Sequence, residues 1–405
     1  MFSVPSVVRK LMKPNIDNCI KCSICTAFCP VFKATGLFPG PKLAGPDAER
    51  FRRRQKAIPA DWLEYCDYCK ICERVCPHKV PIPELHLRSR LAWKKVHRPS
   101  LRNWLLGHSY IFENLGSWAA PFSNWALAWS FTRWLMDRGL KLDRRTYMPA
   151  FKRQTFAKWF RSRPAGQGIP LAYFHGCYTN YLNPEIGKAV VAVLEKNGFR
   201  VVLPPQECCG LPLIANGLMD LASRLGEKNI NSLKNCVGKN MEIVFSSTSC
   251  GMTLMEEYQK ILNLPDAVEV GKHIFDIFQF LWYLHSQGKL NREFKQMNET
   301  FYYHAPCHLR AMGIGLPAVD LLTLIPGVKV LELPEACCGL AGTYGMKKEN
   351  FAIAEEVGRE IFQAVQEKKA EVVLSDCEAC RMQIAFHTGV KTLHPIQVLL
   401  RAYGA

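Results

Sequence analysis

The sequence EACCGLAGTYG at residues 335–345 places two cysteines side by side, and the sequence ECCGLP at residues 207–212 does the same. Two adjacent thiols do not readily pair with each other. Further cysteines precede and follow both pairs in the same order. The equivalent cysteines lie 130, 129 and 127 positions apart, in the pairs Cys177 and Cys307, Cys208 and Cys337, and Cys250 and Cys377. This nearly constant offset indicates two homologous repeats.

Short β-branched apolar runs alternate with stretches of helical length in both repeats. The first repeat contains PLAYF, FRVVLP and EIVF, and the second contains TFYY, VKVLELP and EVVL. This pattern is typical of parallel strands joined by crossover helices, so each repeat is predicted to be an α/β unit. Cysteines follow these strands, and open parallel sheets bind ligands outside the carboxyl ends of their strands. Distant cysteines are therefore expected to converge on one edge, where each adjacent pair offers two thiolates from one turn.

Two evenly spaced cysteine runs lie nearer the N-terminus, CIKCSICTAFCP from Cys19 and CDYCKICERVCP from Cys66. Both match the C-x2-C-x2-C-x3-C-P run of bacterial ferredoxins, in which three cysteines of one run and the fourth of the other hold each [4Fe-4S] cluster. The match implies two ligand sets: Cys19, Cys22, Cys25 and Cys76 for cluster 1, and Cys66, Cys69, Cys72 and Cys29 for cluster 2. A zinc site is disfavoured, because zinc is bound by four ligands in C-x2-C pairs and does not require a third evenly spaced thiol. Two such clusters form an electron relay.

The composition favours metal binding in a reducing compartment. The 405 residues are 48% hydrophobic and include eighteen cysteines, in a chain far longer than small disulfide scaffolds. The stretch MFSVPSVVRKLMKPN lacks the apolar run of a secretory signal, so we expect reduced thiols in the cytoplasm. The net charge of +17 and the pI near 9.2 favour an anionic partner.

An aromatic and basic segment separates the cysteine-rich regions. Residues 133–163 contain ten Lys or Arg and two Asp. Residues 114–132 are uncharged but too polar for a spanning helix. We therefore expect one helix on a membrane surface, with Phe122, Trp125 and Trp129 on one face. The alternative is an aromatic stripe packed on the domain formed by the two cysteine repeats. No nucleic-acid-binding motif accompanies the basic residues, so nucleic acid is not expected as a partner.

The chain is thus predicted to combine α+β and α/β architecture in four regions. A helical two-cluster ferredoxin domain would span residues 1–98, and an aromatic and basic membrane-surface segment residues 99–168. The two cysteine repeats, residues 169–290 and 291–405, would form a duplicated α/β domain with parallel sheets.

The repeats resemble the CCG domain of the heterodisulfide reductase family, specifically of its B subunit, where five cysteines can hold a non-cubane [4Fe-4S] cluster. The resemblance implies a site in the second repeat formed by Cys307, Cys337, Cys338, Cys377 and Cys380. In the first repeat it implies a site of Cys177, Cys208, Cys209 and Cys250, with Thr253 in the fifth place. One or two further iron–sulfur centres are therefore expected. Cys236 lies outside both patterns and is expected to be a core residue.

Almost the whole chain is similar to the family formed by the C subunit of anaerobic glycerol-3-phosphate dehydrogenase. Matching stretches include FPGPKLAGPDAERFR, FHGCYTNY, CCGLPLIANG and DCEACRMQI. The resemblance implies a non-catalytic electron-transfer subunit. Its partners would be the B subunit and the flavoprotein A subunit, which oxidises sn-glycerol 3-phosphate. The acceptor would be a quinone such as menaquinone. The protein would lie peripherally at the cytoplasmic face of the bacterial inner membrane.

Three other interpretations remain open. The iron–sulfur subunit of glycolate oxidase shares the runs and repeats, but is expected to differ at FPGPKLAGPD. A protein of heterodisulfide reductase type would reduce a disulfide at its repeat clusters. A binding module would hold zinc in the repeats without redox chemistry there.

A substrate site is not apparent in the sequence. GIGLPA at residues 313–318 leads into proline and does not run from a strand into a helix, so it is not a dinucleotide fingerprint. Four histidines lie near cysteine-rich strand ends or prolines, namely His175, His304, His308 and His394. They are expected to bond cluster sulfur or, more often, buried backbone.

Overall fold

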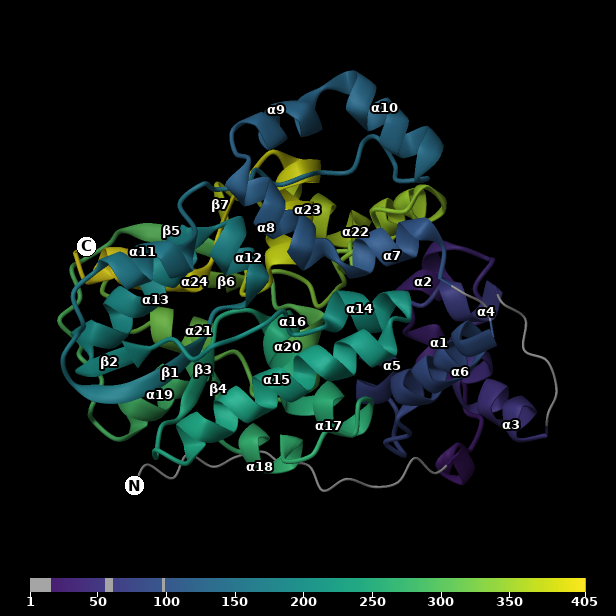
Figure 1. Ribbon diagram of the computed structural model, residues 1–405, viewed down its shortest axis with the longest axis horizontal. Coiled ribbons are helices and arrows are strands. Elements are labelled where there is room, and N and C mark those ends of the chain that lie inside the picture. Colours follow the sequence, from purple (N-terminus) through teal and green to yellow (C-terminus); the bar gives the residue numbers. More distant parts are fainter. Residues whose placement is uncertain (1–15, 55–60, 97–98, 405) are drawn as a thin grey trace.

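The computed structural model of the chain describes residues 16–54, 61–96 and 99–404 (Figure 1). These ranges form a helical N-terminal module, a helical connecting segment and two α/β repeats, each with a four-stranded parallel sheet. The predicted mixed fold with a duplicated α/β domain is therefore confirmed. The four domain boundaries stay predictions. The expected absence of a secretory signal concerns residues 1–15, which lie outside the described residues.

The N-terminal module, called here the ferredoxin module, consists of short helices around the two cysteine runs. The residues on either side of the second cysteine have the same left-handed backbone in both runs. Their φ values are 62° and 64° for Lys21 and Ser23, and 61° for both Tyr68 and Lys70. The runs therefore turn alike. The elements are η1 (Ile16–Asn18), α1 (Ile24–Ala27), α2 (Pro30–Ala34), η2 (Leu43–Asp47), α3 (Ala48–Arg53), α4 (Asp61–Glu64), α5 (Ile71–Arg74) and α6 (Ile82–Val96).

The first repeat has the strand order β2-β1-β3-β4, with every pair parallel. Its longer helices present apolar residues at helical spacing; in α13, Ile186, Val190 and Val193 are all buried. The strands are β1 (Ile169–Phe174), β2 (Phe199–Val202), β3 (Ile243–Phe245) and β4 (Ile274–Asp276). The helices are α12 (Gly176–Tyr181), α13 (Pro184–Lys196), α14 (Leu211–Asn216), α15 (Met219–Val237), α16 (Thr248–Met252), η3 (Thr253–Glu257), α17 (Tyr258–Lys260), α18 (Ala267–Gly271) and α19 (Ile277–Ser286).

The second repeat has the equivalent order β6-β5-β7-β8, also parallel throughout. One hydrophobic core runs through both repeats and includes Val190 and Phe245 of the first and Phe301 and Leu399 of the second. The strands are β5 (Glu299–Tyr303), β6 (Val328–Glu332), β7 (Val372–Leu374) and β8 (Lys391–Leu393). The helices are α20 (Cys307–Met312), α21 (Pro317–Leu322), α22 (Lys348–Glu367), α23 (Glu378–Thr388) and α24 (Pro395–Ala402).

The fourth strand of each sheet is absent from the sequence prediction, which gives three strands per repeat. β4 and β8 are three residues long, and each runs directly into a helix. The helix after β4 begins where Asp276 Oδ1 accepts a hydrogen bond from Phe278 N at 2.8 Å. The helix after β8 begins where His394 Nδ1 accepts one from Ile396 N at 3.1 Å. The strands β3 and β7 are equally short, but they lie in the apolar runs EIVF and EVVL. β4 continues directly into the apolar helix α19 and β8 is Lys-Thr-Leu, so neither gives a separate strand signal in the sequence.

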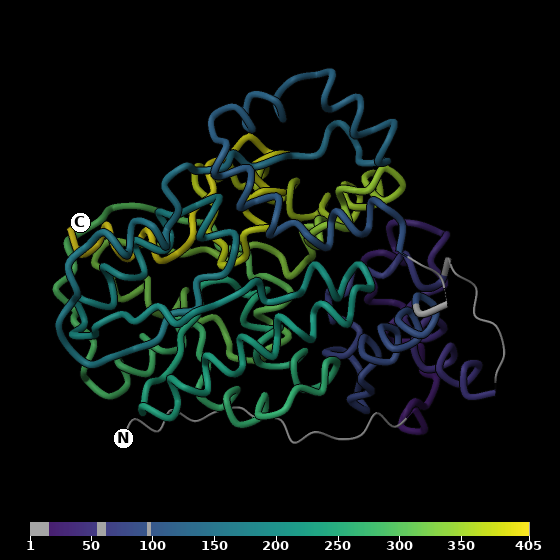
Figure 2. The backbone as a smooth tube through the Cα atoms, in the orientation of Figure 1, coloured from purple at the N-terminus to yellow at the C-terminus, as the bar shows by residue number. Residues whose placement is uncertain are grey.

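The connecting segment leaves the ferredoxin module, rises into a projecting pair of helices and returns to the first repeat (Figure 2). Its helices are α7 (Leu101–Gly107), α8 (Ser109–Trp118), α9 (Phe122–Ala128), α10 (Ser130–Gly139) and α11 (Phe156–Ser162). We call α9 and α10 the aromatic hairpin. The expectation of one helix carrying Phe122, Trp125 and Trp129 is wrong, because Trp129 is extended between the two helices, with ψ 128°. Within the described ranges, no helix is long and apolar enough to cross a membrane.

Candidate iron–sulfur sites

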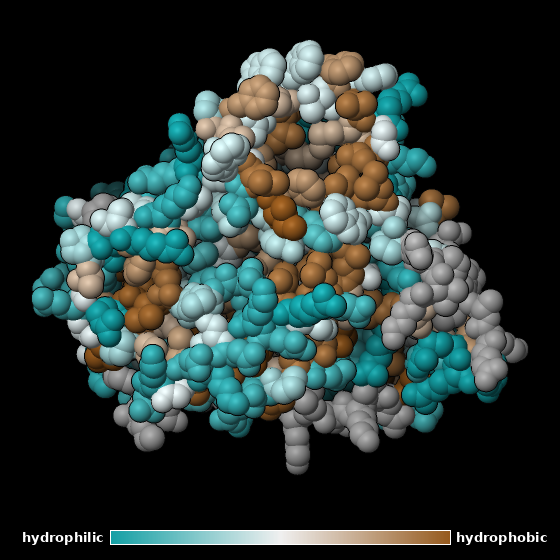
Figure 3. Space-filling view, viewed as in Figure 1, coloured by the Kyte–Doolittle hydropathy of each residue, from teal (hydrophilic) through white to brown (hydrophobic). Residues whose placement is uncertain are grey.

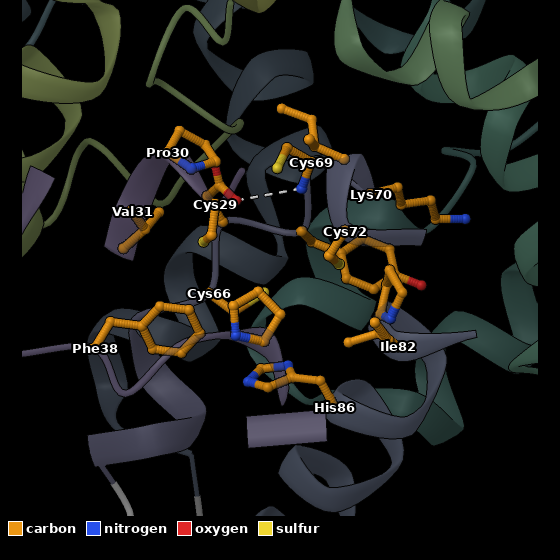
Figure 4. Close-up of a pocket in the computed structure, with 15 residues that line it drawn as sticks. Cys29, Pro30, Val31, Phe38, Cys66, Cys69, Lys70, Cys72, Ile82 and His86 are labelled. Atoms are coloured by element: carbon orange, nitrogen blue, oxygen red, sulfur yellow. Dashed lines mark hydrogen bonds between the residues drawn. The ribbon is translucent and has the colours of Figure 1, made fainter. Parts of the chain in front are cut away.

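Four thiols of the ferredoxin module line one cavity (Figure 4). They are the set predicted to hold cluster 2, namely Cys29, Cys66, Cys69 and Cys72. Buried apolar side chains, among them Val31, Phe38 and Ile82, form much of the remaining wall, which Asp67, Lys70 and His86 also line. Soft thiol donors in an apolar setting suit an iron–sulfur cluster, so the residues present fit the group that the motif implies.

The environment of these thiols keeps them protonated until a cation is present. Burial raises the pKa of Cys66 to about 12, and the neighbouring charge of Asp67 adds to this. Burial likewise raises the pKa of Cys72 well above its ordinary value. Iron binds the thiolate and not the thiol, so cluster assembly must release these protons and place positive charge in the cavity.

Three of the four ligands predicted for cluster 1 lie together in the module. Cys19, Cys25 and Cys76 pack in one apolar cluster with Ile16 and Val80. Burial, followed by the charges of Cys19 and Cys76, raises the pKa of Cys25. Cys22 is exposed, whereas the other seventeen cysteines are buried or partly buried. The first predicted site therefore opens to solvent at Cys22.

In the second repeat the five predicted thiols form a connected group. Hydrogen bonds between thiols join Cys307 to Cys337, Cys337 to Cys338, and both Cys338 and Cys377 to Cys380. Cys307 begins α20 after β5, the adjacent pair follows β6, and Cys377 caps α23 after β7. Three strand ends thus bring these thiols to one edge of the sheet, as the sequence predicts.

The glycine of each CCG triplet has a backbone that other residues rarely adopt. Gly339 has φ +86°, and a Cβ at this position would lie 2.0 Å from the carbonyl oxygen of Ala354. Gly210 has φ +88°. The absence of a side chain lets the turn pack against α22 in the second repeat, which points the adjacent thiols into the site.

In the first repeat four thiols are connected in the same way. Thiol–thiol hydrogen bonds link Cys177 to Cys208, Cys208 to Cys209, and Cys209 to Cys250. Thr253 occupies the fifth place and is fully buried, with its Oγ1 donating to the carbonyl of Ser249 at 2.8 Å. A neutral hydroxyl is a poor substitute for a thiolate on iron.

All the ligand assignments stay predictions, although the structure brings most members of each set together. Among the described residues, no three His, Cys, Asp or Glu side chains converge on a point that could hold a single metal ion. An iron–sulfur cluster does not require such a point, because its cysteines bind different irons. Cys236 lies in the hydrophobic core on α15, as expected.

Asp67, which the sequence analysis does not identify as a site residue, connects two of the predicted sites. One carboxylate oxygen accepts a hydrogen bond from Cys69 N at 3.3 Å, and the other accepts one from the Cys337 thiol at 3.6 Å. Burial raises the pKa of Asp67 to about 7, and the charge of Cys337 adds to this. The available signal is a carboxylate inside the cysteine run, at the position where the other run has Ile20.

Two further, half-buried acids approach the repeat sites. Glu378 stands between Cys377 and Cys380, and its two carboxylate oxygens each accept from Ser247 Oγ at 3.0 Å, which joins the second repeat to the first. Glu113 of α8 hydrogen-bonds the Cys177 thiol, and burial raises the pKa of Glu113 to about 7. Glu378 lies inside the Cys377–Cys380 motif, which is the available sequence signal for it, whereas Glu113 lies outside every cysteine motif and the sequence carries no signal for it.

A buried ion pair fixes the ferredoxin module to the first repeat. Lys70 Nζ lies 2.5 Å from Glu257 and 3.1 Å from Glu256, in the η3 turn that follows Cys250 and α16. Tyr68 also donates a hydrogen bond to Glu257, at 3.0 Å. The residues beside Cys69 therefore contact both repeats, through Asp67 on one side and Lys70 on the other.

Three of the four histidines hydrogen-bond backbone groups. His175 Nδ1 pairs with the carbonyl of Gly176 at 2.7 Å, and His394 Nε2 with that of Ser246 at 2.9 Å. His308 bonds the backbone of Tyr68. Among the described residues, the ring nitrogens of His304 have no hydrogen-bond partner. Burial lowers its pKa to about 4, so the ring is neutral at physiological pH.

Comparison with known proteins agrees with this architecture. The chain matches the 4Fe-4S dicluster domain family over residues 15–80 and the cysteine-rich (CCG) domain family over residues 171–255 and 301–385. It is 27% identical to the B subunit of fumarate reductase (CoM/CoB) of Methanothermobacter marburgensis, over 91% of this chain and 68% of that protein. It is 24% identical to the D subunit of dihydromethanophenazine:CoB–CoM heterodisulfide reductase of Methanosarcina barkeri, over 92% and 88%.

A higher similarity extends over almost the full chain. The C subunit of anaerobic glycerol-3-phosphate dehydrogenase of Escherichia coli K12 is 38% identical over 393 residues, which are 96% of this chain and 98% of that protein. Both cysteine runs and both repeats fall within the matched length. The resemblance inferred from the motifs is confirmed, and the chain belongs to the family formed by the C subunit of anaerobic glycerol-3-phosphate dehydrogenase.

Proposed function

We propose that this protein carries electrons from the flavoprotein subunits of an anaerobic glycerol-3-phosphate dehydrogenase to quinone in the membrane. The observation that supports this most directly is the contact of Cys69 and Cys337 with the two oxygens of Asp67. A ligand predicted for cluster 2 and a ligand predicted for the second repeat thus share one buried neighbour. Bound clusters would supply one-electron carriers at these positions.

The order of the predicted sites gives the relay two ends. Cys22 opens to solvent at one end, and the cavity of Cys29, Cys66, Cys69 and Cys72 follows. Asp67 leads to the second repeat, and the bond of Glu378 to Ser247 leads on to the first. In this proposal the cysteines hold the electron carriers. Asp67 and Glu378 connect the residues around one carrier to the residues around the next. We take residues 98, 168 and 290 as the domain limits.

The aromatic hairpin is proposed to hold the protein at the membrane surface. Phe122, Trp125 and Trp129 are 67%, 60% and 51% exposed, so they are not core residues. Neighbouring ring centroids lie 5.7 Å and 5.8 Å apart in this series. Apolar side chains gather over the hairpin at the top of the molecule (Figure 3). Tryptophan favours the membrane interface, and the basic residues 133–163 would attract anionic lipid.

Reconstitution with the A and B subunits of the dehydrogenase tests the proposal. Glycerol 3-phosphate should reduce menaquinone in lipid vesicles only when the iron-loaded chain is present, while a soluble dye should be reduced without it. Electron paramagnetic resonance should show the centres becoming reduced by substrate. Quinone reduction by the flavoprotein alone would contradict the proposal. Productive assembly with a glycolate-oxidising flavoprotein, and not with this one, would transfer the chain to the related glycolate system.

A further inference from the structure

An exposed apolar face surrounds Cys22. Ile20 and Phe28 are 60% and 55% exposed, and Ile24 is also exposed. Lys21 and Ser23, which flank Cys22, are exposed as well. We call Cys22, Ile20, Ile24 and Phe28 the entry face. All four residues belong to the first cysteine run, so this face directly covers the ligand set predicted for cluster 1.

The second cysteine run has an equivalent face 47 positions later. Cys22 corresponds to Cys69, Ile20 to Asp67, and Ile24 to Ile71. The backbone supports this alignment, because the two residues flanking each central cysteine have matching positive φ values. The helices α1 and α5, which follow these cysteines, also pack against each other. The module therefore presents two related faces, one from each run.

The second-run face is buried against the next predicted centre. Asp67 receives the thiol hydrogen bond of Cys337, and Lys70 pairs with Glu257. Cys69 itself is buried. At the first-run face, by contrast, Cys22, Ile20 and Ser23 are exposed. One face is thus covered by a redox domain of the same chain, and its counterpart is open to solvent.

We propose that the entry face docks the electron-donating flavoprotein, in the way the second-run face docks the repeats. This inference rests on the proposed function. Apolar side chains at the centre of an interface exclude water and provide contact area. Because the rate of electron transfer falls steeply with distance, a cluster ligand within the contact area favours transfer by shortening the path from the donor. A reduced flavin would pass its two electrons singly through this face and release its protons on the donor side.

A protein partner suits this face better than lipid. The entry face contains no tryptophan or tyrosine, the residues that favour a membrane interface. The aromatic hairpin lies over the repeats on the connecting segment, apart from the ferredoxin module (Figure 1). A protein held to a membrane by the hairpin therefore keeps a separate face for its donor.

The double variant Ile20→Ser with Phe28→Ser tests the inference in the full chain, co-expressed with the flavoprotein subunits. Its clusters should be retained and reduced by dithionite with unchanged paramagnetic resonance spectra. Its affinity for the purified flavoprotein should fall about tenfold or more, because two central side chains are truncated. When the flavoprotein is limiting, the rate at which glycerol 3-phosphate reduces the clusters of this variant should fall in proportion to the loss of affinity.

Matched changes separate the face from general loss of apolar surface. Val268→Ser and Leu331→Ser remove exposed apolar side chains from the repeats and should leave donor affinity unchanged. If the double variant loses iron, Ile20→Lys alters one exposed side chain and should give the same loss of affinity. Iron-loaded Ile20→Lys with normal donor affinity would overturn the inference and leave the proposed function standing. Failure of the unmodified chain to bind the flavoprotein would overturn both. If the entry-face variants lose binding to lipid vesicles but keep normal affinity for the flavoprotein, the entry face is a lipid contact, which would also overturn the inference.

Discussion

The Cys337 thiol donates a hydrogen bond to the Asp67 carboxylate across 3.6 Å, although the two residues lie 270 positions apart. This contact joins the predicted cluster 2 region to the predicted site of the second repeat. Asp67 is buried, and its other oxygen accepts from the backbone of Cys69. The predicted cluster 2 region is therefore in direct contact with the second repeat, to which an electron in the ferredoxin module would pass next.

Serine at Cys69 should interrupt the relay while leaving the flavoprotein active. Cys69 lies in the cavity wall beside Asp67, and a hydroxyl is a poor replacement for a thiolate on iron. Dye-linked oxidation of glycerol 3-phosphate should persist, whereas quinone reduction by the assembled complex should be abolished. Cys236→Ser, a change in the hydrophobic core away from the predicted sites, provides the control for cysteine loss. Continued quinone reduction by an assembled Cys69→Ser complex would refute the relay.

A thiol at position 253 should strengthen iron binding in the first repeat. Thr253 is buried in the fifth ligand place, beside Cys209. The unmodified chain should lose iron from the first repeat before the second on exposure to air, and Thr253→Cys should slow that loss. Iron analysis and paramagnetic resonance during timed oxidation would measure both rates. Thr248→Cys, a buried change at the start of α16, is the control. Equal loss from the two repeats of the unmodified chain would show that the missing thiol is unimportant.

Removal of the hairpin aromatics should release the protein from membranes. Changing Phe122, Trp125 and Trp129 to serine removes exposed rings, so iron content should be retained. The variant should move to the soluble fraction in vesicle sedimentation. High salt should weaken attachment of the unmodified protein without abolishing it, because salt screens basic residues and not aromatic insertion. Iron loss and aggregation of the variant would instead identify these rings as structural.

Asp276→Asn should stabilise the protein at alkaline pH. Burial, followed by the charge of Asp376, raises the pKa of Asp276 in the folded state. The folded state thus holds this proton more tightly than the unfolded state, so stability is greatest below the ordinary carboxyl pKa and falls as pH rises toward the raised value. The loss is about 1.4 kcal/mol per pH unit within that window.

Urea unfolding near pH 5 and near pH 8 would measure this effect. Asparagine keeps an oxygen that can accept from Phe278 N, so the start of α19 should be retained. The advantage of Asp276→Asn over the unmodified protein should grow between the two pH values. Asp320→Asn, on the surface of α21, is the control and should not change the slope. Parallel pH profiles for Asp276→Asn and the unmodified chain would contradict the expectation.

The sequence predicts the cysteine runs and the α/β repeats, but it does not predict two short strands or the break in the aromatic hairpin. Cysteine spacing and apolar periodicity are local features, so they predict the ferredoxin runs, the duplicated α/β repeats and the gathering of cysteines at strand ends. The strand β4 is missed because it continues into an apolar helix, and β8 because Lys-Thr-Leu is not an apolar run, whereas the equally short β3 and β7 lie in apolar runs. The break at Trp129 is missed because the aromatic spacing continues across it.

The sequence by itself determined which thiols belong to each repeat and each run, because ligand spacing is written along the chain. The tertiary structure alone decided how those groups meet. Asp67 and Cys337, or Ser247 and Glu378, are brought together by packing between distant segments, which no local pattern encodes. It also decided that Cys22 is open while Cys69 is covered. Both cysteines occupy the same place in the same motif, and only the burial of one face against the repeats distinguishes them.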